Sequence, residues 1–347
     1  MAISSMASDK VAKARAQRSR AQSRTQIRIG TRGSPLALAQ AHETRNRLLK
    51  AHPDLGAENV QIVPITTSGD RSGRHQFGAT GSNRPAEPLA GSGGVKGLFT
   101  KEIEEALADG RVDIAVHSMK DLPTLLPDGL IVACLLPRED PRDGLVVGPG
   151  IKGAGGLGEL PASAVVGTSS LRRRAQILHS RPKLKVVEFR GNVETRLAKL
   201  KAGLADATLL AMAGLSRLGL ASVASAVLDS NEILPAVAQG AIGIECREAD
   251  DFIRALLASL NHADTESAIT AERALLAALD GSCHTPIAAL ATREGEKLIL
   301  RAAIYRPDGS EMLSAMSEGD LHDAARMGRE VGLELRARAG AGFFEQA

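Results

Sequence analysis

The segment Ala164-Val-Val-Gly-Thr168-Ser169-Ser170-Leu-Arg172-Arg173-Arg174 indicates the fold class, because an apolar strand there runs into a helix across a turn of hydroxyl and arginine side chains. The same pattern occurs at Ile27-Arg-Ile-Gly-Thr-Arg32-Gly-Ser34-Pro35-Leu and at Val186-Val-Glu-Phe-Arg190-Gly-Asn-Val-Glu-Thr-Arg196. Strands that alternate with helices are typical of parallel sheets covered by helices. Ligands of such sheets bind beyond the carboxyl ends of the strands, where these three turns are expected to lie.

Arginine is an unusual residue at the start of a helix. The first helical turn exposes unpaired N–H groups and the positive end of the helix dipole, so a cation there is unfavourable by about 0.3–1 kcal/mol. A bound anion would reverse this effect, and the guanidinium fork suits carboxylate or phosphate. We therefore expect a cleft for a small molecule with many negative charges. Arg172, Arg173 and Arg190 should repel one another while that cleft is empty.

The body of the chain is expected to alternate strands and helices. Strands are expected at residues 27–29, 60–66, 112–116, 130–136, 164–166, 186–189 and 207–211, and helices at residues 99–108, 171–179 and 193–201. Ser34 is a suitable cap for a helix that begins at Pro35. Leu171, Ala175 and Leu178 should form the core face of their helix.

Residues 263–347 have a different pattern from the rest of the body. A helix at residues 266–279 is followed by strand-like segments at residues 287–292 and 298–304, which together predict a small α+β domain. Residues 69–95 are rich in Gly, Ser and Pro. Such a long irregular stretch is either a surface insertion or a functional lid.

The composition argues against a nucleic-acid binder and a membrane protein. The 347 residues carry a formal charge of +3, but residues 1–26 alone hold +5, so the body is slightly acidic. Trp is absent and there is a single Tyr, which leaves few platforms for base stacking. No run of about 18 apolar residues predicts a membrane span. Residues 1–26 are rich in Ala, Ser and Arg, so they are either an organelle transit peptide or a disordered tail.

Two short motifs carry candidate chemistry. Lys120 and Asp121 follow an apolar strand, and a carboxylate at that edge of a sheet can transfer protons or stabilise a cation. A helix cap or a local salt bridge with Lys120 is the simpler interpretation. Three cysteines give no disulfide framework. Cys134 and Cys246 lie in apolar runs and should be buried, whereas Cys283 is expected on an accessible loop beside a histidine. A single loop cysteine can also be incidental.

The ordered set of motifs resembles the porphobilinogen deaminase family, also called hydroxymethylbilane synthases, from about Ile27 to Phe344. The motifs that carry the resemblance are Gly30-Thr-Arg-Gly-Ser-Pro-Leu-Ala, Ala115-Val-His-Ser-Met-Lys-Asp-Leu-Pro, Arg138-Glu-Asp-Pro-Arg-Asp, Gly167-Thr-Ser-Ser-Leu-Arg-Arg, Arg190-Gly-Asn-Val, Leu234-Pro-Ala-Val-Ala-Gln239-Gly and Asp280-Gly-Ser-Cys. Details such as Asp280-Gly-Ser-Cys and the ending Arg338-Ala-Gly-Ala-Gly-Phe-Phe look most like the plastid enzymes of plants and algae, which favours a transit peptide and a plastid stroma over the cytoplasm.

The resemblance implies an α/β fold with two periplasmic-binding-protein-like domains and a small C-terminal α+β domain. Domain 1 would comprise residues 27–136 with 241–258, domain 2 residues 142–234 and domain 3 residues 263–347, preceded by the tail at 1–26. The implied enzyme is a monomer that condenses four porphobilinogen molecules head to tail, with release of ammonia, to give hydroxymethylbilane for heme and chlorophyll.

The resemblance also implies roles for individual residues. Asp121 matches the catalytic carboxylate, and Cys283 matches the thiol that holds a dipyrromethane cofactor through a thioether bond. The residues that match the carboxylate-binding set are Arg32, Ser34, Lys120, Thr168, Ser169, Ser170, Arg172, Arg173, Arg190 and Arg196, with Arg217 and Gln239 as less central members. Lys96 matches a further ligand, but Val95 is an extra residue beside it and the preceding stretch is long, so the role of Lys96 stays open.

A binding module without catalysis is the competing interpretation. A solute-binding domain for a dicarboxylate would explain the arginine turns and the alternation of strands and helices equally well. It would not explain an accessible cysteine in a third domain, and the intact mass of the protein would distinguish the two.

Overall fold

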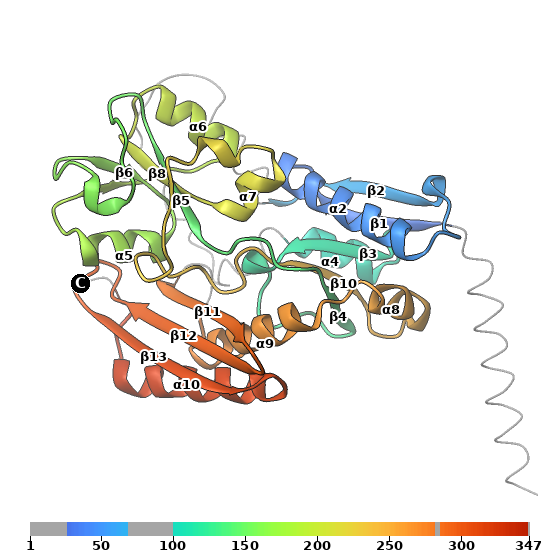
Figure 1. Cartoon of the computed structure of the whole chain (residues 1–347). Coiled ribbons are helices and arrows are strands. Elements are labelled where there is room, and N and C mark those ends of the chain that lie inside the picture. Colours follow the sequence, from blue (N-terminus) through green and yellow to red (C-terminus); the bar gives the residue numbers. More distant parts are fainter. Residues whose placement is uncertain (1–25, 69–99, 282–284, 346–347) are drawn as a thin grey trace, which may run out of the picture.

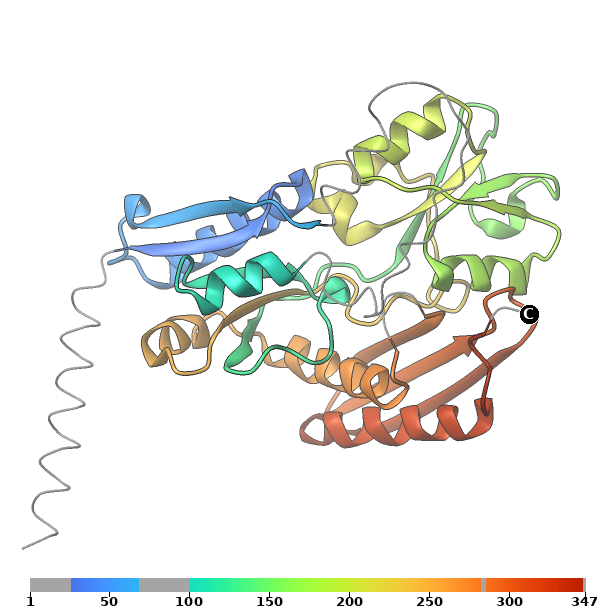
Figure 2. The ribbon, with the colours of Figure 1, turned by 180° about the vertical axis from the view of Figure 1, so that it is seen from behind.

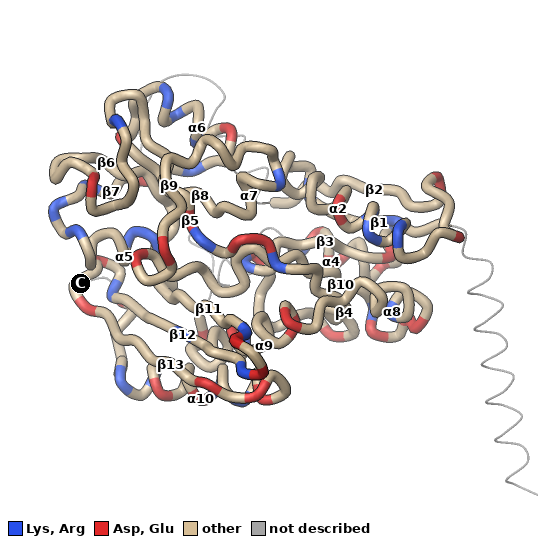
Figure 3. Tube along the Cα trace, viewed as in Figure 1, with Lys and Arg blue, Asp and Glu red and all other residues tan. Residues whose placement is uncertain are grey.

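The computed structural model describes residues 26–68, 100–281 and 285–345. Two α/β domains lie side by side, and a third, smaller domain lies against both of them (Figures 1 and 2). The expected fold class is confirmed. Basic and acidic residues are scattered over all three domains (Figure 3). Within the described ranges, no helix has both the length and the apolar character that a membrane crossing requires.

Domain 1 is built on a five-stranded sheet with helices on both faces. The strand order is β2 (Val60–Ile65), β1 (Ile27–Arg32), β3 (Ile114–Ser118), β10 (Ile242–Arg247) and β4 (Leu130–Leu135). Helices α2 (Pro35–Ala51) and α8 (Asp251–Ala258) pack through Leu48 and Leu257 against one face, where Ile29 and Ile244 are buried. Helix α4 (Lys101–Ala108) covers the other face; Phe99, its expected first residue, lies outside the described ranges.

Domain 2 repeats this plan. Its strand order is β7 (Lys185–Val187), β6 (Val165–Gly167), β8 (Ala207–Ala211), β5 (Asp143–Val147) and β9 (Ala226–Val227), and its helices are α5 (Leu171–Ser180), α6 (Val193–Lys201) and α7 (Met212–Arg217). Ile177 of α5 and Leu209 of β8 belong to one core, whereas Leu200 of α6 and Leu215 of α7 belong to the core on the opposite face.

Both sheets are mixed, so the expectation of parallel sheets was wrong for part of each. β1 is parallel to β2 and β3, but β10 is antiparallel to β3 and β4. In domain 2, β6 is parallel to its neighbours, but β5 is antiparallel to β8 and β9. The two exceptions have the same cause. β5 and β10 each come directly after a segment in which the chain crosses from one domain to the other. Each therefore enters its sheet from the opposite end.

The two crossings run beside each other between the domains. The backbone N–H of Glu139 in the first crossing donates to the carbonyl of Gly240 in the second, at 3.3 Å. Gly240 has a φ of +91°, and a Cβ atom there would lie 2.3 Å from the Glu139 carbonyl oxygen. Only glycine fits both the backbone conformation and the close approach.

Domain 3 is a three-stranded antiparallel sheet covered on one face by two helices. The strands are β11 (Ile287–Glu294), β12 (Lys297–Tyr305) and β13 (Met312–Asp320), and the helices are α9 (Ala263–Ala278) and α10 (Ala324–Ala339). Gly328 of α10 lets the helices approach closely, because a Cβ atom there would lie 2.0 Å from the carbonyl oxygen of Ala271. Met119 and Leu122 of domain 1 belong to the same core as α9, so the third domain is packed onto the first.

Candidate active site

A pocket of about 60 Å³ lies at the carboxyl ends of β1 and β3. Ser34 of the β1–α2 turn caps α2 through its Oγ, which accepts from the N–H of Ala37 at 3.4 Å, and Pro35 is the first helical residue as expected. The polar residues that line the pocket are Arg32, Ser34, Gln40, Thr100, His117, Ser118 and Asp121. The first arginine turn and the Lys120–Asp121 motif therefore meet at one site.

Lys120 and Asp121 lie on the one-turn helix η2 (Met119–Asp121) directly after β3. Asp121 is exposed at the rim of the pocket, whereas Lys120 is half-buried. Burial lowers the pKa of Lys120; the charge of Asp121 opposes this effect, and the charge of Arg173 in domain 2 adds to it. The two motif residues thus lie where charges from both domains act on them.

The β6–α5 turn of domain 2 begins the helix that carries Arg173, whose charge acts on Lys120. Ser170 caps α5, since its Oγ accepts from the N–H of Arg173 at 3.4 Å. Thr168 is buried, and its Oγ1 accepts from the N–H of Ser170 at 3.2 Å. Ser169 is exposed, and its Oγ lies 3.4 Å from a guanidinium nitrogen of Arg196. The hydroxyl groups therefore fix the turn, and Ser169 is the one most open to a ligand.

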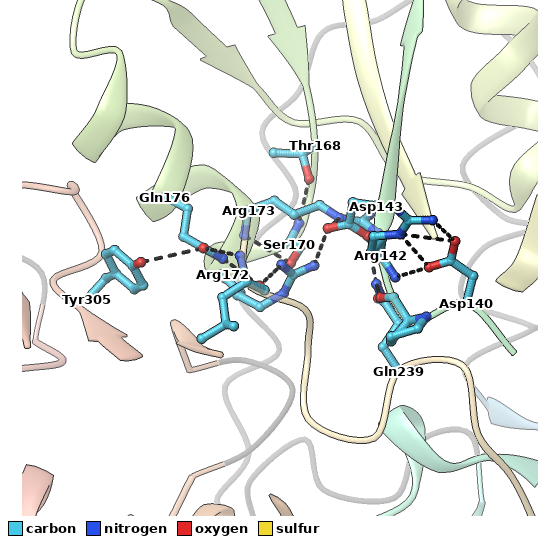
Figure 4. Close-up of polar contacts among 12 residues, drawn as sticks. Asp140, Arg142, Asp143, Thr168, Ser170, Arg172, Arg173, Gln176, Gln239 and Tyr305 are labelled. Carbon is cyan, nitrogen blue, oxygen red and sulfur yellow. Dashed lines mark hydrogen bonds and ion pairs between the residues drawn. The ribbon is translucent and has the colours of Figure 1, made fainter. Parts of the chain in front are cut away.

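Arg172 and Arg173 share a buried carboxylate, that of Asp143 at the start of β5 (Figure 4). Arg172 donates to Asp143 at 2.7 Å, and Arg173 donates through Nε at 3.1 Å and through Nη2 at 2.8 Å. Burial alone would raise the pKa of Asp143, but the charges of the two arginines outweigh it and hold that pKa well below its usual range. All three residues are 5% exposed or less.

This arrangement corrects the expectation that Arg172 and Arg173 lack a protein partner in the empty cleft. Three charges lie together, two positive and one negative, so the Asp143 carboxylate offsets part of the expected repulsion. The expected core face was also wrong: α5 buries Arg172 and Arg173 beside Ala175, whereas Leu171 and Leu178 are only half-buried. Arg172 is held further by a bond to the carbonyl of Leu234 at 2.7 Å.

Arg196 differs from these two arginines because no carboxylate pairs with it in the described ranges. Its one hydrogen bond goes to Ser169, and its buried Nε has no partner among the described residues. Burial lowers the pKa of Arg196 to about 10; the charge of Arg173 contributes, and that of Asp121 opposes it. A desolvated guanidinium of this kind is suited to an incoming carboxylate.

We expect Arg196→Met to impair ligand binding while leaving the fold intact. Loss of a charge-assisted hydrogen bond is worth about 1.5–3 kcal/mol, which corresponds to about a 10- to 100-fold lower kcat/KM. The ligand-free protein should melt at the wild-type temperature or slightly above it, because a desolvated cation is removed. Arg174→Met, an exposed change on α5, serves as the control. A loss of several kcal/mol from the ligand-free variant would instead assign Arg196 to the structure.

Three other candidate residues lie outside the pocket. Arg190 is exposed and forms an ion pair with Glu188. Arg217 of α7 reaches across to domain 1, where it pairs with Glu43 at 3.1 Å, and it also donates to the carbonyl of Gly240 at 3.1 Å. Gln239 donates to Asp143 at 2.8 Å. Gln239 therefore links the second crossing to the carboxylate of Asp143, and Arg217 links α7 to α2 and to the same crossing.

The sequence reasoning missed residues that support the site. In the sequence, Asp143 was noted only as the last residue of the Arg138-Glu-Asp-Pro-Arg-Asp motif. A carboxylate directly before the apolar run Gly-Leu-Val-Val is a signal of a buried charge, and this signal could have identified it. Gln40 and Ser118 hydrogen-bond each other in the pocket at 2.7 Å. No feature of the sequence predicted that pair, because the two residues are far apart in the chain.

Two candidate residues and one segment lie outside the described ranges. They are Cys283, Lys96 and the stretch at residues 69–95. The other two cysteines are buried, as expected. Burial raises the pKa of Cys134 to about 12 and that of Cys246 to about 11, so neither thiol is suited to form a thiolate near neutral pH.

Comparison with known proteins gives two matching family models. The model described as porphobilinogen deaminase, dipyromethane cofactor binding domain, matches residues 27–255, and the model described as porphobilinogen deaminase, C-terminal domain, matches residues 267–337. The chain belongs to the porphobilinogen deaminase family. The resemblance found in the sequence motifs is therefore confirmed, and so is the dipyrromethane cofactor, which the first description names.

Individual porphobilinogen deaminases are similar over most of the chain. The enzyme of Paracoccus denitrificans is 54% identical over 319 residues, which cover 92% of this chain and 96% of that protein. The chloroplastic enzyme of Oryza sativa subsp. japonica is 54% identical over 323 residues, covering 92% and 86% respectively. Among solved structures, the periplasmic VFT2 domain of Bordetella pertussis BvgS is 13% identical with a TM-score of 0.39, covering 70% of this chain and 90% of that chain.

Proposed function

We propose that this chain condenses four porphobilinogen molecules head to tail, with release of ammonia, to give hydroxymethylbilane in tetrapyrrole biosynthesis. The observation that carries the proposal is the pocket of domain 1, which is lined by Asp121, whose charge acts on Arg196 of domain 2. Porphobilinogen bears an acetate, a propionate and an aminomethyl group. A site with one exposed carboxylate and several guanidinium groups matches both signs of charge on that molecule.

Asp121 is the residue that we assign to the chemical step. Loss of ammonia from porphobilinogen leaves an electron-poor azafulvene, whose positive charge is shared by the pyrrole nitrogen. A fixed carboxylate beside that N–H stabilises the cation and can pass a proton to the leaving amine. Asp121 is exposed at the pocket rim on a turn that follows a buried strand, so it is both accessible and held in place.

The arginine wall is assigned to carboxylate binding. Arg196 offers a buried Nε that no other described group uses, and Arg32 and Ser34 line the pocket of domain 1. Arg172, by contrast, is tied to Asp143 and Leu234 on both terminal nitrogens. We infer that Arg172 and Asp143 fix the position of Arg173, and that Arg173 and Arg196 contact the ligand.

The described residues fit a dipyrromethane cofactor. Its four carboxylates require cations, and the buried, unpartnered Nε of Arg196 beside Arg173 is a receptor for such a group. The residues that would hold the cofactor are Arg173, Arg196, Ser169 and Lys120. When bound, the cofactor supplies the first nucleophilic pyrrole carbon of the growing chain. We propose Cys283 as its attachment point, through a thioether.

The intact mass of the purified protein tests the attachment. We expect denatured protein to be heavier than its sequence mass by two pyrrole units, with the adduct on the peptide that contains Cys283. Cys283→Ser should have the unmodified mass, whereas Cys134→Ser should keep the adduct because that thiol is buried. An active protein with a free thiol at Cys283 would contradict the assignment.

Turnover tests the overall function against the binding-module alternative. Purified protein given porphobilinogen should release one ammonia for each molecule consumed, and mass spectrometry should find an open tetrapyrrole. A solute-binding module would bind porphobilinogen without releasing ammonia, and this outcome would reject the proposal.

We also propose a location and an assembly state. Relatives from Oryza sativa and Pisum sativum are described as chloroplastic, and residues 1–26 are basic and rich in Ala and Ser, which favours the plastid stroma with heme and chlorophyll as end products. The cytoplasm is the alternative. To decide between the two locations, a fluorescent protein can be fused behind residues 1–26 and tested for import into isolated chloroplasts. Light scattering would test the proposed monomer.

A further inference from the structure

A second ionisable pair lies at the pocket that holds Asp121. His117 of β3 lines this pocket and is only 6% exposed. Its Nε2 lies 3.0 Å from Oε2 of Glu245 on β10, which is completely buried. The strand register explains the contact: His117 is opposite Gly243, so Glu245, two residues further along β10, lies on the same face of the sheet.

Charged groups from the neighbouring elements act on this pair. Glu104 of α4 lies near both residues; burial raises its pKa, and the charge of Glu245 adds to the rise. Arg273 of α9 interacts with the charge of Glu245 from the third domain. Arg32 and Asp121 line the same pocket as His117. The imidazole therefore has a carboxylate at one nitrogen and further charges of both signs around it.

The contact with Glu245 distinguishes the two ring nitrogens of His117. In the tautomer whose Nε2–H donates to the Glu245 carboxylate, Nδ1 is an acceptor. No described residue hydrogen-bonds Nδ1. An imidazole that is oriented by a carboxylate at one nitrogen, and has no hydrogen-bond partner among the described residues at the other, has the arrangement of a general base.

We propose that His117, oriented by Glu245, is a second catalytic residue, which accepts the proton that a pyrrole ring loses on coupling. This inference rests on the proposed function. In that step a C–C bond forms between the methylene carbon of porphobilinogen and the free α carbon of the ring that attacks it. The C–H bond at that α carbon then breaks, and its electron pair restores the aromatic ring. The proton moves to Nδ1, and the released ammonia takes it up as ammonium.

Asp121 and His117 have different roles in this proposal because they lie at different depths in the pocket. Asp121, exposed at the rim, stabilises the developing cation and serves the leaving amine, while His117 takes the ring proton inside the pocket. The imidazolium that forms is stabilised by the buried carboxylate of Glu245. Asp121 therefore does not have to accept a proton while its negative charge is needed.

The test uses holoenzyme with His117→Gln, which can still donate to Glu245 but cannot take up a proton. We expect single-turnover coupling to slow about 10²-fold, the lower end of the range for a lost general base. Porphobilinogen with deuterium at its free α carbon should show a larger kinetic isotope effect in the variant than in wild type. His52→Gln, whose Nε2 lies 2.9 Å from the Leu256 carbonyl outside the pocket, should change neither value.

Glu245→Gln provides a second readout. Removing the negative charge destabilises the imidazolium, so the acid limb of the pH–rate profile should move to lower pH. The ¹⁵N shifts of His117 should report a hydrogen on Nε2 in wild type and a changed tautomer population in the variant. Wild-type coupling in His117→Gln, or slow coupling with an unchanged isotope effect and a lower melting temperature, would overturn the proposal. Failure of the proposed function is separate, because wild type would then release no ammonia.

Discussion

Asp121→Asn should slow ring coupling by about 10²–10⁴, because the amide keeps the size of the side chain but loses the charge that stabilises the cation. The fold should survive, since Asp121 is exposed at the rim of the pocket and no hydrogen bond within the described ranges depends on it. Stopped-flow or quenched single-turnover measurements on loaded enzyme would give the coupling rate. Intact mass would show that the cofactor is still attached.

The control is Asp128→Asn, which removes an equal charge from an exposed loop of the same domain. Its coupling rate should equal that of wild type. If Asp121→Asn turns over at a near-normal rate, Asp121 has no part in the mechanism, and the rim carboxylate is only a partner in the local charge balance with Lys120.

Asp143→Asn should destabilise the ligand-free protein by about 3–5 kcal/mol, the usual effect of removing one partner from a buried ionic group. Arg172 and Arg173 would then lie together in the interior without the carboxylate that accepts three of their hydrogen bonds. Chemical denaturation of wild type and variant would measure the difference. Asp140→Asn, which removes the half-buried partner of the exposed Arg142 guanidinium, should cost no more than about 1 kcal/mol.

The same carboxylate makes stability depend on pH in a definite direction. The folded-state pKa of Asp143 is far below that of an unfolded aspartate, so its contribution is complete above about pH 4 and is lost as the pH falls further. Asp143→Asn should therefore flatten the acid side of the stability curve. If the variant and wild type lose stability in parallel below pH 4, Asp143 is not the group responsible.

Local sequence patterns predicted the parts of the fold that depend on neighbouring residues. The bounds of α6 and β8 match the expected ranges, and the caps formed by Ser34 and Ser170 follow from their position before a helix. The antiparallel strands β5 and β10 could not be predicted in this way, because their direction depends on where the chain crosses between domains. Apolar runs alone do not indicate a strand direction.

The candidate site was also predictable only where it depends on neighbouring residues in the sequence. The positions of Arg32 and Asp121 in one pocket followed from the rule that binding residues collect at the carboxyl ends of strands. The pairing of Arg172 and Arg173 with Asp143 did not follow, because the partner lies about thirty residues away and reaches them only through the sheet of domain 2. A helix-start arginine thus indicates an anion, but not whether the anion is a ligand or a side chain.

The buried carboxylate of Glu272 on α9 connects the third domain to both segments in which the chain crosses between domains 1 and 2. It pairs with Arg138 at 2.6 Å in the first crossing, accepts from the N–H of Ala238 at 2.6 Å in the second, and accepts from the N–H of Ala291 at 2.8 Å in β11. These hydrogen bonds and this ion pair therefore stabilise more than one domain. Although the backbone divides into three bodies, their stabilities are shared, and damage to the joint weakens all three at once.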